Sequence, residues 1–214
     1  MDTSLLAPFI IIALIDYFLG SIPSGYLAGR MAGVDIRTMG SGNIGATNVT
    51  RMLGKRYGYP VFLADFSKGL AAVGLAMLAG QRFGLTNSYE ALKILGAISC
   101  VIGNTFPVWL RFRGGKGVAT SAGALFGLTP LATLIAVVFW VIIFQITRYV
   151  SVASIVAAIG LPLTILVMTD FTQPNQSLLF YFSICLAAVI ILRHRSNLSR
   201  LMQGTEQRFD RSEN

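Results

Sequence analysis

The sequence predicts an all-α integral membrane protein, a bundle of about seven transmembrane helices with its N-terminus outside and its C-terminus in the cytoplasm. Hydrophobic residues make up 54% of the 214 residues and charged residues only 12%, whereas soluble domains carry about 25% charged residues. Long apolar runs alternate with short polar segments, and one span requires about 20 residues. The whole chain, 1–214, is predicted to be a single membrane-embedded domain.

The first expected span covers 5–28 and contains Asp16, an intramembrane carboxylate of the kind that is usually paired or functional. Pro23 lies among small residues and predicts a kinked, closely packed helix. The second span, 59–80, carries Asp65 and Lys68 three residues apart, which favours an ion pair facing the bundle. Whether Asp16 joins that pair stays open.

The later spans depend on how the apolar run 118–146 is divided. As one helix it would be about 43 Å long, against a hydrocarbon core of about 30 Å. Thr129-Pro130 near its middle is a natural break. The remaining expected spans are therefore 91–110, 118–128, 131–146, 151–168 and 177–192.

The distribution of positive charge fixes the predicted topology. With seven spans, the cytoplasmic segments are the loops 29–58, 111–117 and 147–150 and the tail 193–214. These segments hold all of the 17 basic residues except Arg82, Lys93 and the in-span Lys68. A single span over 118–146 would divide the charges evenly, and the positive-inside rule therefore favours the seven-span arrangement.

The segment from Arg37 to Arg56 reads RTMGSGNIGATNVTRMLGKR and is rich in glycine, small polar residues and cations. Glycines let backbone N–H groups approach an anion, and a following helix adds its dipole. The pattern predicts a phosphate-binding loop followed by a helix over 46–53, with an ordinary basic loop as the alternative. The G-x-G-x-x-G match inside it lacks a preceding strand, which excludes a dinucleotide site.

A second glycine-rich segment, from Arg111 to Gly117, reads RFRGGKG, and the tail carries His194, the single histidine. The predicted topology places both with the first loop on the cytoplasmic face. Lys116 is followed by glycine, so this is not a Walker loop. The net charge of +8 favours anionic lipids and substrates, with no nucleic acid as a partner. Neither metal-ligand spacing nor a disulfide framework is present.

Together these segments resemble the bacterial acyl-phosphate:glycerol-3-phosphate acyltransferase family of the PlsY type, over nearly the whole chain. The matching residues are Gly20-Ser21, Pro23, Gly25, Gly40-Ser41-Gly42-Asn43-Ile44-Gly45-Ala46-Thr47-Asn48, Arg51, Gly54-Lys55, Asp65, Lys68, Phe106-Pro107, Gly114-Gly115-Lys116-Gly117-Val118-Ala119-Thr120, Tyr149, Ser151, Ala153-Ser154, Arg193-His194, Asn197 and Arg200. One departure is Gly103-Asn104, where the family has Gly-His. An obligatory histidine base at position 104 is therefore in question: either the site is structural, or the asparagine weakens the activity.

The resemblance implies an enzyme of phospholipid biosynthesis in the bacterial cytoplasmic (inner) membrane, with its active site on the cytoplasmic face. It would move an acyl group from acyl phosphate to the first hydroxyl of glycerol 3-phosphate, giving lysophosphatidic acid and phosphate. Neither a cofactor nor direct use of coenzyme A or acyl carrier protein is expected. Membrane lipids complete the expected partners.

The resemblance also assigns candidate site residues. His194, Asn197 and Ser41 are expected to be catalytic, although the donor phosphate is an alternative acceptor for the hydroxyl proton. The candidate phosphate-binding residues are Ser41, Gly42, Asn43, Gly45, Thr47, Asn48, Arg51, Gly114, Gly115, Lys116 and Gly117.

Two other functions fit part of the pattern. A transporter of phosphorylated metabolites would use the same anion-binding loops, but such proteins place their site at the midplane between repeats, and no repeat is apparent. A lipid-binding scaffold would bind these ligands without turnover.

Overall fold

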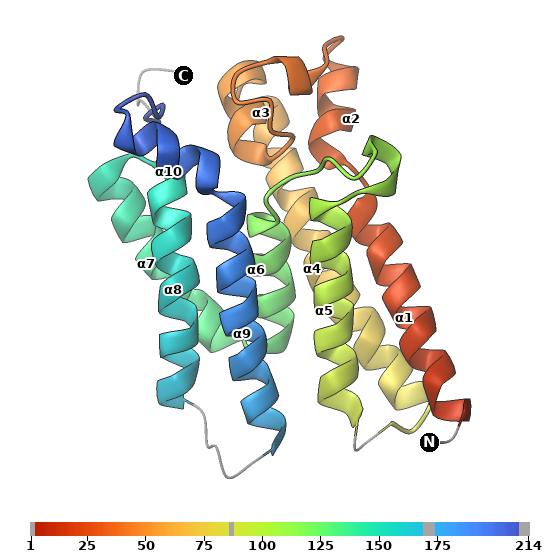
Figure 1. The fold of residues 1–214 in the computed structure, drawn as a ribbon. Helices are drawn as coiled ribbons and strands as arrows, with labels where there is room; N and C mark the ends of the chain where they lie inside the picture. The colour runs from red at the N-terminus through yellow and green to blue at the C-terminus, as the bar shows by residue number, and fades with distance from the viewer. Residues whose placement is uncertain (1–2, 86–87, 169–173, 210–214) are drawn as a thin grey trace. The chain divides into compact units, whose positions relative to one another are not determined.

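The computed structural model describes residues 3–85, 88–168 and 174–209, and the regular elements within these ranges are all helices (Figure 1). The last residues of the predicted tail, 210–214, lie outside the described residues. The chain divides into two compact units, Met1–Leu128 and Thr129–Asn214, which we describe one at a time.

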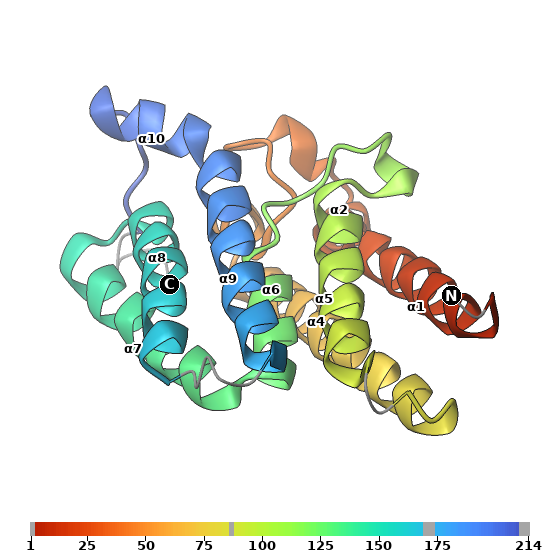
Figure 2. The same cartoon turned by 60° about the horizontal axis from the view of Figure 1, so that its bottom comes forward.

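The first unit is built around α4, with α5 and α6 packed along it and α1 packed along α5 (Figure 2). Shorter helices cover one end of the unit. Its elements are α1 (Thr3–Ser21), α2 (Ser24–Met31), η1 (Ile36–Thr38), α3 (Ala46–Leu53), α4 (Lys55–Arg82), α5 (Tyr89–Thr105), η3 (Val108–Leu110) and α6 (Val118–Leu128).

The second unit is a row of three long helices in which α8 packs against both α7 and α9. A short helix, α10, follows α9 after a bend of 53°. This helix lies within the segment that the sequence analysis assigned to the cytoplasmic tail, 193–214, where no helix was predicted. The elements are α7 (Pro130–Thr147), α8 (Val150–Met168), α9 (Pro174–Arg193) and α10 (Arg195–Met202).

Helices occur at all seven predicted places, and the all-helical membrane fold is confirmed. Within the described residues, five helices are long and apolar enough to cross a membrane, and a sixth is added if α9 and α10 are taken as one bent span. The helix Val118–Leu128 is shorter than this criterion requires. The count of seven spans and the orientation of the termini therefore stay predictions.

Proline sets three of the helix ends. The first span is interrupted between Ser21 and Ser24, around Pro23, and the 118–146 run is divided immediately before Pro130, which begins α7. The segment Tyr89–Leu110 forms one candidate span, as predicted for 91–110, but it is not one continuous helix: α5 ends at Thr105 and η3 follows Pro107. The residue that precedes Pro107 is disfavoured in the α conformation, and the chain leaves the helix there.

Glycines allow the helices of the first unit to approach closely. A Cβ on Gly69 of α4 would overlap the carbonyl oxygen of Thr120 on α6, and one on Gly123 would overlap the carbonyl of Phe66. Between α1 and α5, a Cβ on Gly20 would overlap the carbonyl of Cys100. Small residues are favoured at membrane helix interfaces because the association depends on close packing.

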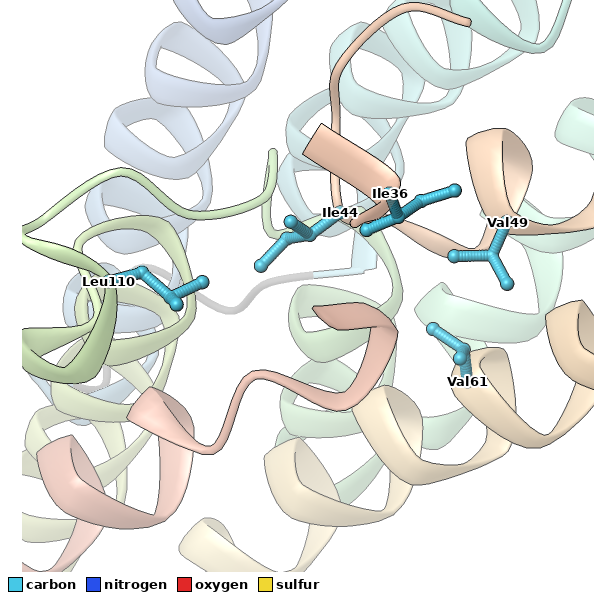
Figure 3. Close-up of a cluster of buried hydrophobic side chains, with 5 residues drawn as sticks. All are labelled: Ile36, Ile44, Val49, Val61 and Leu110. Carbon is cyan, nitrogen blue, oxygen red and sulfur yellow. The ribbon is translucent and has the colours of Figure 1, made fainter. Parts of the chain in front are cut away.

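A buried apolar cluster at one end of the first unit joins the two glycine-rich segments. Its members are Ile36, Ile44, Val49, Val61 and Leu110 (Figure 3). Ile44 belongs to the first glycine-rich loop and Leu110 immediately precedes the second. Val61 belongs to α4, so this cluster attaches both loops to the same end of the central helix.

We expect Gly69→Ala to destabilise the protein by about 1–3 kcal/mol, because the added methyl group overlaps backbone on α6 and the helices must separate. The matched control is Gly74→Ala on the same helix, where a Cβ meets nothing within 4 Å. This control should be neutral or slightly stabilising, since alanine favours helix over glycine. Apparent melting temperatures in detergent compare the two, and equal values would contradict the packing argument.

Candidate functional site

The first loop, residues 39–45, is organised by the buried side chain of Asn48. Its Nδ2 donates to the carbonyl oxygens of Met39 (3.1 Å) and Asn43 (2.9 Å), and its Oδ1 accepts from the Ser41 N–H (3.0 Å). A third, longer contact reaches the Ile36 carbonyl at 3.5 Å. Asn48 is only 3% exposed, and its amide is used to hold the loop.

The glycines of this loop have conformations and contacts that a side chain would disturb. Gly40 and Gly42 have φ values of +54° and +69°, and a Cβ on Gly40 would lie 2.5 Å from Asn48 Oδ1. The N–H of Gly42 donates to the Met39 carbonyl (2.9 Å) and that of Gly45 to Asn43 Oδ1 (2.8 Å). To bind phosphate, these two N–H groups would have to give up their hydrogen bonds to Met39 and Asn43.

The groups that remain available in this segment lie on its surface and at the start of α3. Ser41 is exposed. Gly45 is the N-cap of α3, and the N–H groups of Ala46 and Thr47 lie in its first turn, where a helix provides no acceptor of its own. The predicted helix over 46–53 is confirmed. Its positive end favours an anion.

An exposed ion pair flanks the loop on its N-terminal side. Arg37 lies 2.6 Å from Asp35 and its guanidinium stacks 4.7 Å from the ring centroid of Tyr26. Hydrogen bonds from Arg37 lower the pKa of Asp35 to about 2. Arg37 is thus already engaged with a carboxylate.

The second loop, residues 111–117, rests on the C-terminal turn of α5. The N–H groups of Gly114 and Gly115 donate to the carbonyls of Thr105 (3.1 Å) and Asn104 (3.0 Å). A Cβ on Gly114 would overlap the Asn104 carbonyl. The loop begins with two left-handed residues, Arg111 and Phe112, at φ +51° and +61°. The N–H groups of Gly114 and Gly115 are therefore used to attach the loop to α5. Lys116 directly follows Gly115.

Beneath the loops, the predicted pair of Asp65 and Lys68 is confirmed, with Lys68 Nζ 2.9 Å from Asp65 Oδ1. The same ammonium donates to Asn104 Oδ1 (2.7 Å) and to the Ile22 carbonyl (3.0 Å). Asp16 is fully buried, and neither of its carboxylate oxygens has a hydrogen-bond partner among the described residues. Asp16 thus does not share hydrogen bonds with the pair.

In the second unit, His194 and Asn197 lie close together at the junction of α9 and α10. His194 is 2% exposed, and its Nδ1 lies 2.8 Å from the Ile190 carbonyl oxygen. Because a carbonyl only accepts, Nδ1 carries the hydrogen, and the neutral ring has its basic lone pair on Nε2. Asn197 is the third residue of α10 and is also buried.

Sequence reasoning missed Glu206, a buried carboxylate that holds this region together. Glu206 Oε1 accepts from Asn197 Nδ2 (2.6 Å) and Ser151 Oγ (3.1 Å), and Oε2 from Arg200 Nε (2.8 Å). Burial raises the pKa of Glu206, but the hydrogen bonds from Asn197, Arg200 and Ser151 outweigh burial and hold the pKa below its ordinary value. The only sequence signal was an acidic residue within a basic tail.

The structure therefore brings the predicted residues together in two groups. In the first unit, the loops that contain Ser41 and Lys116 attach to one apolar cluster. In the second, Glu206 joins Asn197, three residues after His194, to the start of α8. The groups of three or more His, Cys, Asp or Glu side chains that a metal site needs are absent from the described residues.

Comparisons with known proteins agree in pointing to one family. Residues 10–204 match the family described as glycerol-3-phosphate acyltransferase. The chain is 41% identical over 193 residues to a glycerol-3-phosphate acyltransferase of Trichlorobacter lovleyi, covering 90% of this chain and 93% of that protein.

Two crystal structures of PlsY, an integral membrane glycerol 3-phosphate acyltransferase, are similar to this chain at 40% identity. The glycerol 3-phosphate form has a TM-score of 0.83 and covers 94% of this chain and 96% of that one. The lysophosphatidic acid form has a TM-score of 0.81 and covers 96% and 97%.

We expect Asn48→Asp to disrupt the first loop more than Asn48→Ala does. The aspartate replaces an N–H donor with an oxygen that faces carbonyl oxygens, whereas alanine only removes the bonds. Unsatisfied buried groups cost about 1–3 kcal/mol each. Hydrogen exchange of the amides of residues 39–45 reports the loss, and unchanged protection in Asn48→Asp would contradict this role.

Acid should loosen the C-terminal segment through Glu206. Because its folded pKa is depressed, its stabilisation is present above the unfolded value of about 4.3 and is lost as the pH falls through the folded pKa. Glu206→Gln removes the Arg200 ion pair, should cost about 1–3 kcal/mol and should abolish this pH dependence. Limited proteolysis of residues 195–209 across this pH range tests it, and equal acid sensitivity in both proteins would refute it.

Proposed function

The chain belongs to the glycerol-3-phosphate acyltransferase family, and we propose that its acyl donor is acyl phosphate. The acyl group would pass to the sn-1 hydroxyl of glycerol 3-phosphate, giving lysophosphatidic acid and inorganic phosphate for phospholipid biosynthesis. The PlsY structures in glycerol 3-phosphate and lysophosphatidic acid forms support this acceptor and this product. Neither a cofactor nor direct use of coenzyme A or acyl carrier protein is needed in this scheme.

The observation that carries the proposal is the attachment of two glycine-rich loops, with cations in or near them, to one end of the first unit. Ile44 of the first loop and Leu110, which immediately precedes the second, belong to one buried cluster with Val61 of α4 (Figure 3). Both proposed substrates carry phosphate, and this arrangement supplies cations for it. We assign Ser41, Arg51 and Lys116 to the phosphate of glycerol 3-phosphate, because a hydroxyl and two cations give charge-assisted hydrogen bonds.

Backbone groups complete the phosphate site in this proposal. The N–H groups of Ala46 and Thr47 at the start of α3 favour an anion. Asn43 lies before this turn with its Oδ1 already holding the Gly45 N–H, so its role is to shape the turn that receives the substrate. Asn48 likewise shapes the first loop, because its amide is bonded to the backbone of Met39, Ser41 and Asn43. The glycines Gly42, Gly45, Gly114, Gly115 and Gly117 let the backbone fold tightly enough to present these groups.

The chemistry follows from the donor. The hydroxyl oxygen attacks the acyl carbonyl carbon, the bond between that carbon and the phosphate oxygen breaks, and phosphate leaves with the bonding electrons. Phosphate is a good leaving group, so transfer needs no covalent enzyme intermediate. The protein then contributes positioning of two anions and stabilisation of charge on the carbonyl oxygen.

His194 and Asn197 are assigned to the reacting hydroxyl and carbonyl. With Nδ1 bound to the Ile190 carbonyl, Nε2 of His194 is the nitrogen that can accept a proton. Asn197 is held by Glu206, which fixes the orientation of its amide. The departing phosphate is the competing proton acceptor. The excess of basic residues in the segments that carry these groups supports the proposal that they lie on the cytoplasmic face of the bacterial inner membrane.

Phosphate release by the purified protein in lipid, with acyl phosphate and with or without glycerol 3-phosphate, tests the function. Release that depends on glycerol 3-phosphate, with an equal amount of lysophosphatidic acid, is the expected result. Equal release with and without the acceptor would indicate hydrolysis. Binding without turnover would favour a scaffold, and uptake of intact glycerol 3-phosphate into vesicles would favour a transporter.

The assigned roles predict that one variant changes mainly KM and another mainly kcat. Lys116→Gln should raise KM for glycerol 3-phosphate about 10- to 100-fold, the loss expected for one charged hydrogen bond. His194→Gln should lower kcat about 100-fold or more, the contribution typical of a general base. Arg113→Gln, in the same loop as Lys116 and exposed, is the matched control and should change neither. If a folded His194→Gln protein retains kcat, the donor phosphate rather than His194 accepts the hydroxyl proton.

A further inference from the structure

Lys68 is a buried cation that the proposed chemistry does not use. It is 6% exposed and lies inside α4, one of the helices long and apolar enough to cross a membrane. Burying an ammonium group away from water is unfavourable unless it is paired and hydrogen-bonded. Its three oxygen contacts come from three different parts of the first unit, which is more than an intrahelical ion pair requires.

The first contact outside α4 leads to the second glycine loop. Lys68 Nζ donates to Asn104 Oδ1 at 2.7 Å, and the backbone carbonyl of Asn104 accepts from the Gly115 N–H at 3.0 Å. The Asn104 amide also faces the loop, since a Cβ on Gly115 would lie 3.3 Å from its Nδ2. Asn104 thus accepts a hydrogen bond from Lys68 through its side chain and one from Gly115 through its backbone carbonyl. Gly115 directly precedes Lys116.

The second contact leads towards the first glycine loop. Lys68 donates to the Ile22 carbonyl at 3.0 Å, in the break between α1 and α2. Three residues later, Gly25 packs so closely on the loop that a Cβ there would overlap the Ile44 carbonyl. The ammonium therefore fixes the break directly before α2, the helix whose Gly25 packs against this loop.

We propose that Lys68 is a positioning residue for substrate binding, whose ammonium holds the C-terminal turn of α5 and the α1–α2 break and so sets both glycine loops. This inference rests on the proposed function of those loops as the glycerol 3-phosphate site. Asn104 is the link to the Lys116 loop. A neutral acceptor suits that position, because Asp65 already supplies the negative charge that pairs with Lys68.

The test compares Lys68→Met and Asn104→Leu with the unaltered protein, using KM and kcat together with calorimetric titration of glycerol 3-phosphate. Each variant should raise KM and Kd for glycerol 3-phosphate about 10-fold or more, with a smaller change in kcat, since displaced binding groups can cost 100-fold. The double variant should be no worse than the poorer single one. Asn104→His should retain near-normal KM, because a ring nitrogen can accept the same hydrogen bond.

The matched control is Lys93→Met. Lys93 also pairs with a carboxylate three residues away, Glu90, at 2.6 Å, and its side chain is 11% exposed. The pair lies at the other end of α5 from the loops. This variant should leave both KM and Kd unchanged.

Three results would overturn the inference. Folded Lys68→Met with unchanged Kd would remove Lys68 from positioning, and a fall in kcat at unchanged KM would make it a catalytic group instead. If Lys68→Met does not fold, Asn104→Leu decides, because it leaves Lys68 paired with Asp65, and an unchanged Kd there overturns the link. Lack of turnover in unaltered protein that binds glycerol 3-phosphate would instead refute the proposed function. Lack of both binding and turnover would refute both.

Discussion

The structure depends on one constraint, which is that hydrocarbon offers no hydrogen bonds to the backbone. Helices satisfy the constraint internally, and buried backbone between them must be paired by other groups wherever water does not reach it. Asn48 closes the first glycine loop, the carbonyls of Asn104 and Thr105 hold the second, and Glu206 holds the junction of α10 with α8. Each irregular segment that carries candidate chemistry is thus fixed by a buried polar group.

This closure changes how anion recognition can work. Glycine loops often bind phosphate through a concave row of N–H groups, yet the N–H groups of Gly42, Gly45, Gly114 and Gly115 are already bonded within the protein. In the proposed function, phosphate recognition therefore falls to side chains and to the start of α3. A scaffold that is fixed before the substrate arrives needs little reorganisation in the reaction, which fits a transfer in which positioning does most of the work.

The parts of the fold that the sequence predicted are those governed by local rules. Apolar runs located the helices, Pro23 and Pro130 marked two breaks, and the spacing of Asp65 and Lys68 predicted their ion pair. The parts that it did not predict depend on long-range contacts. Glu206 meets a serine 55 residues away in sequence, and Lys68 meets an asparagine 36 residues away. Periodicity carries no information about such pairs.

The asparagine at position 104 acquires a physical reason from this long-range contact. Around the Lys68 ammonium lie one carboxylate, one backbone carbonyl and one amide oxygen, so the charges balance within the pair. A second carboxylate in place of the amide would leave an excess negative charge in a buried site, and an apolar residue would leave the ammonium one acceptor short. The position therefore requires a neutral acceptor that can also support the loop after α5. Asparagine meets that requirement through its side-chain oxygen and its backbone carbonyl, without proton transfer.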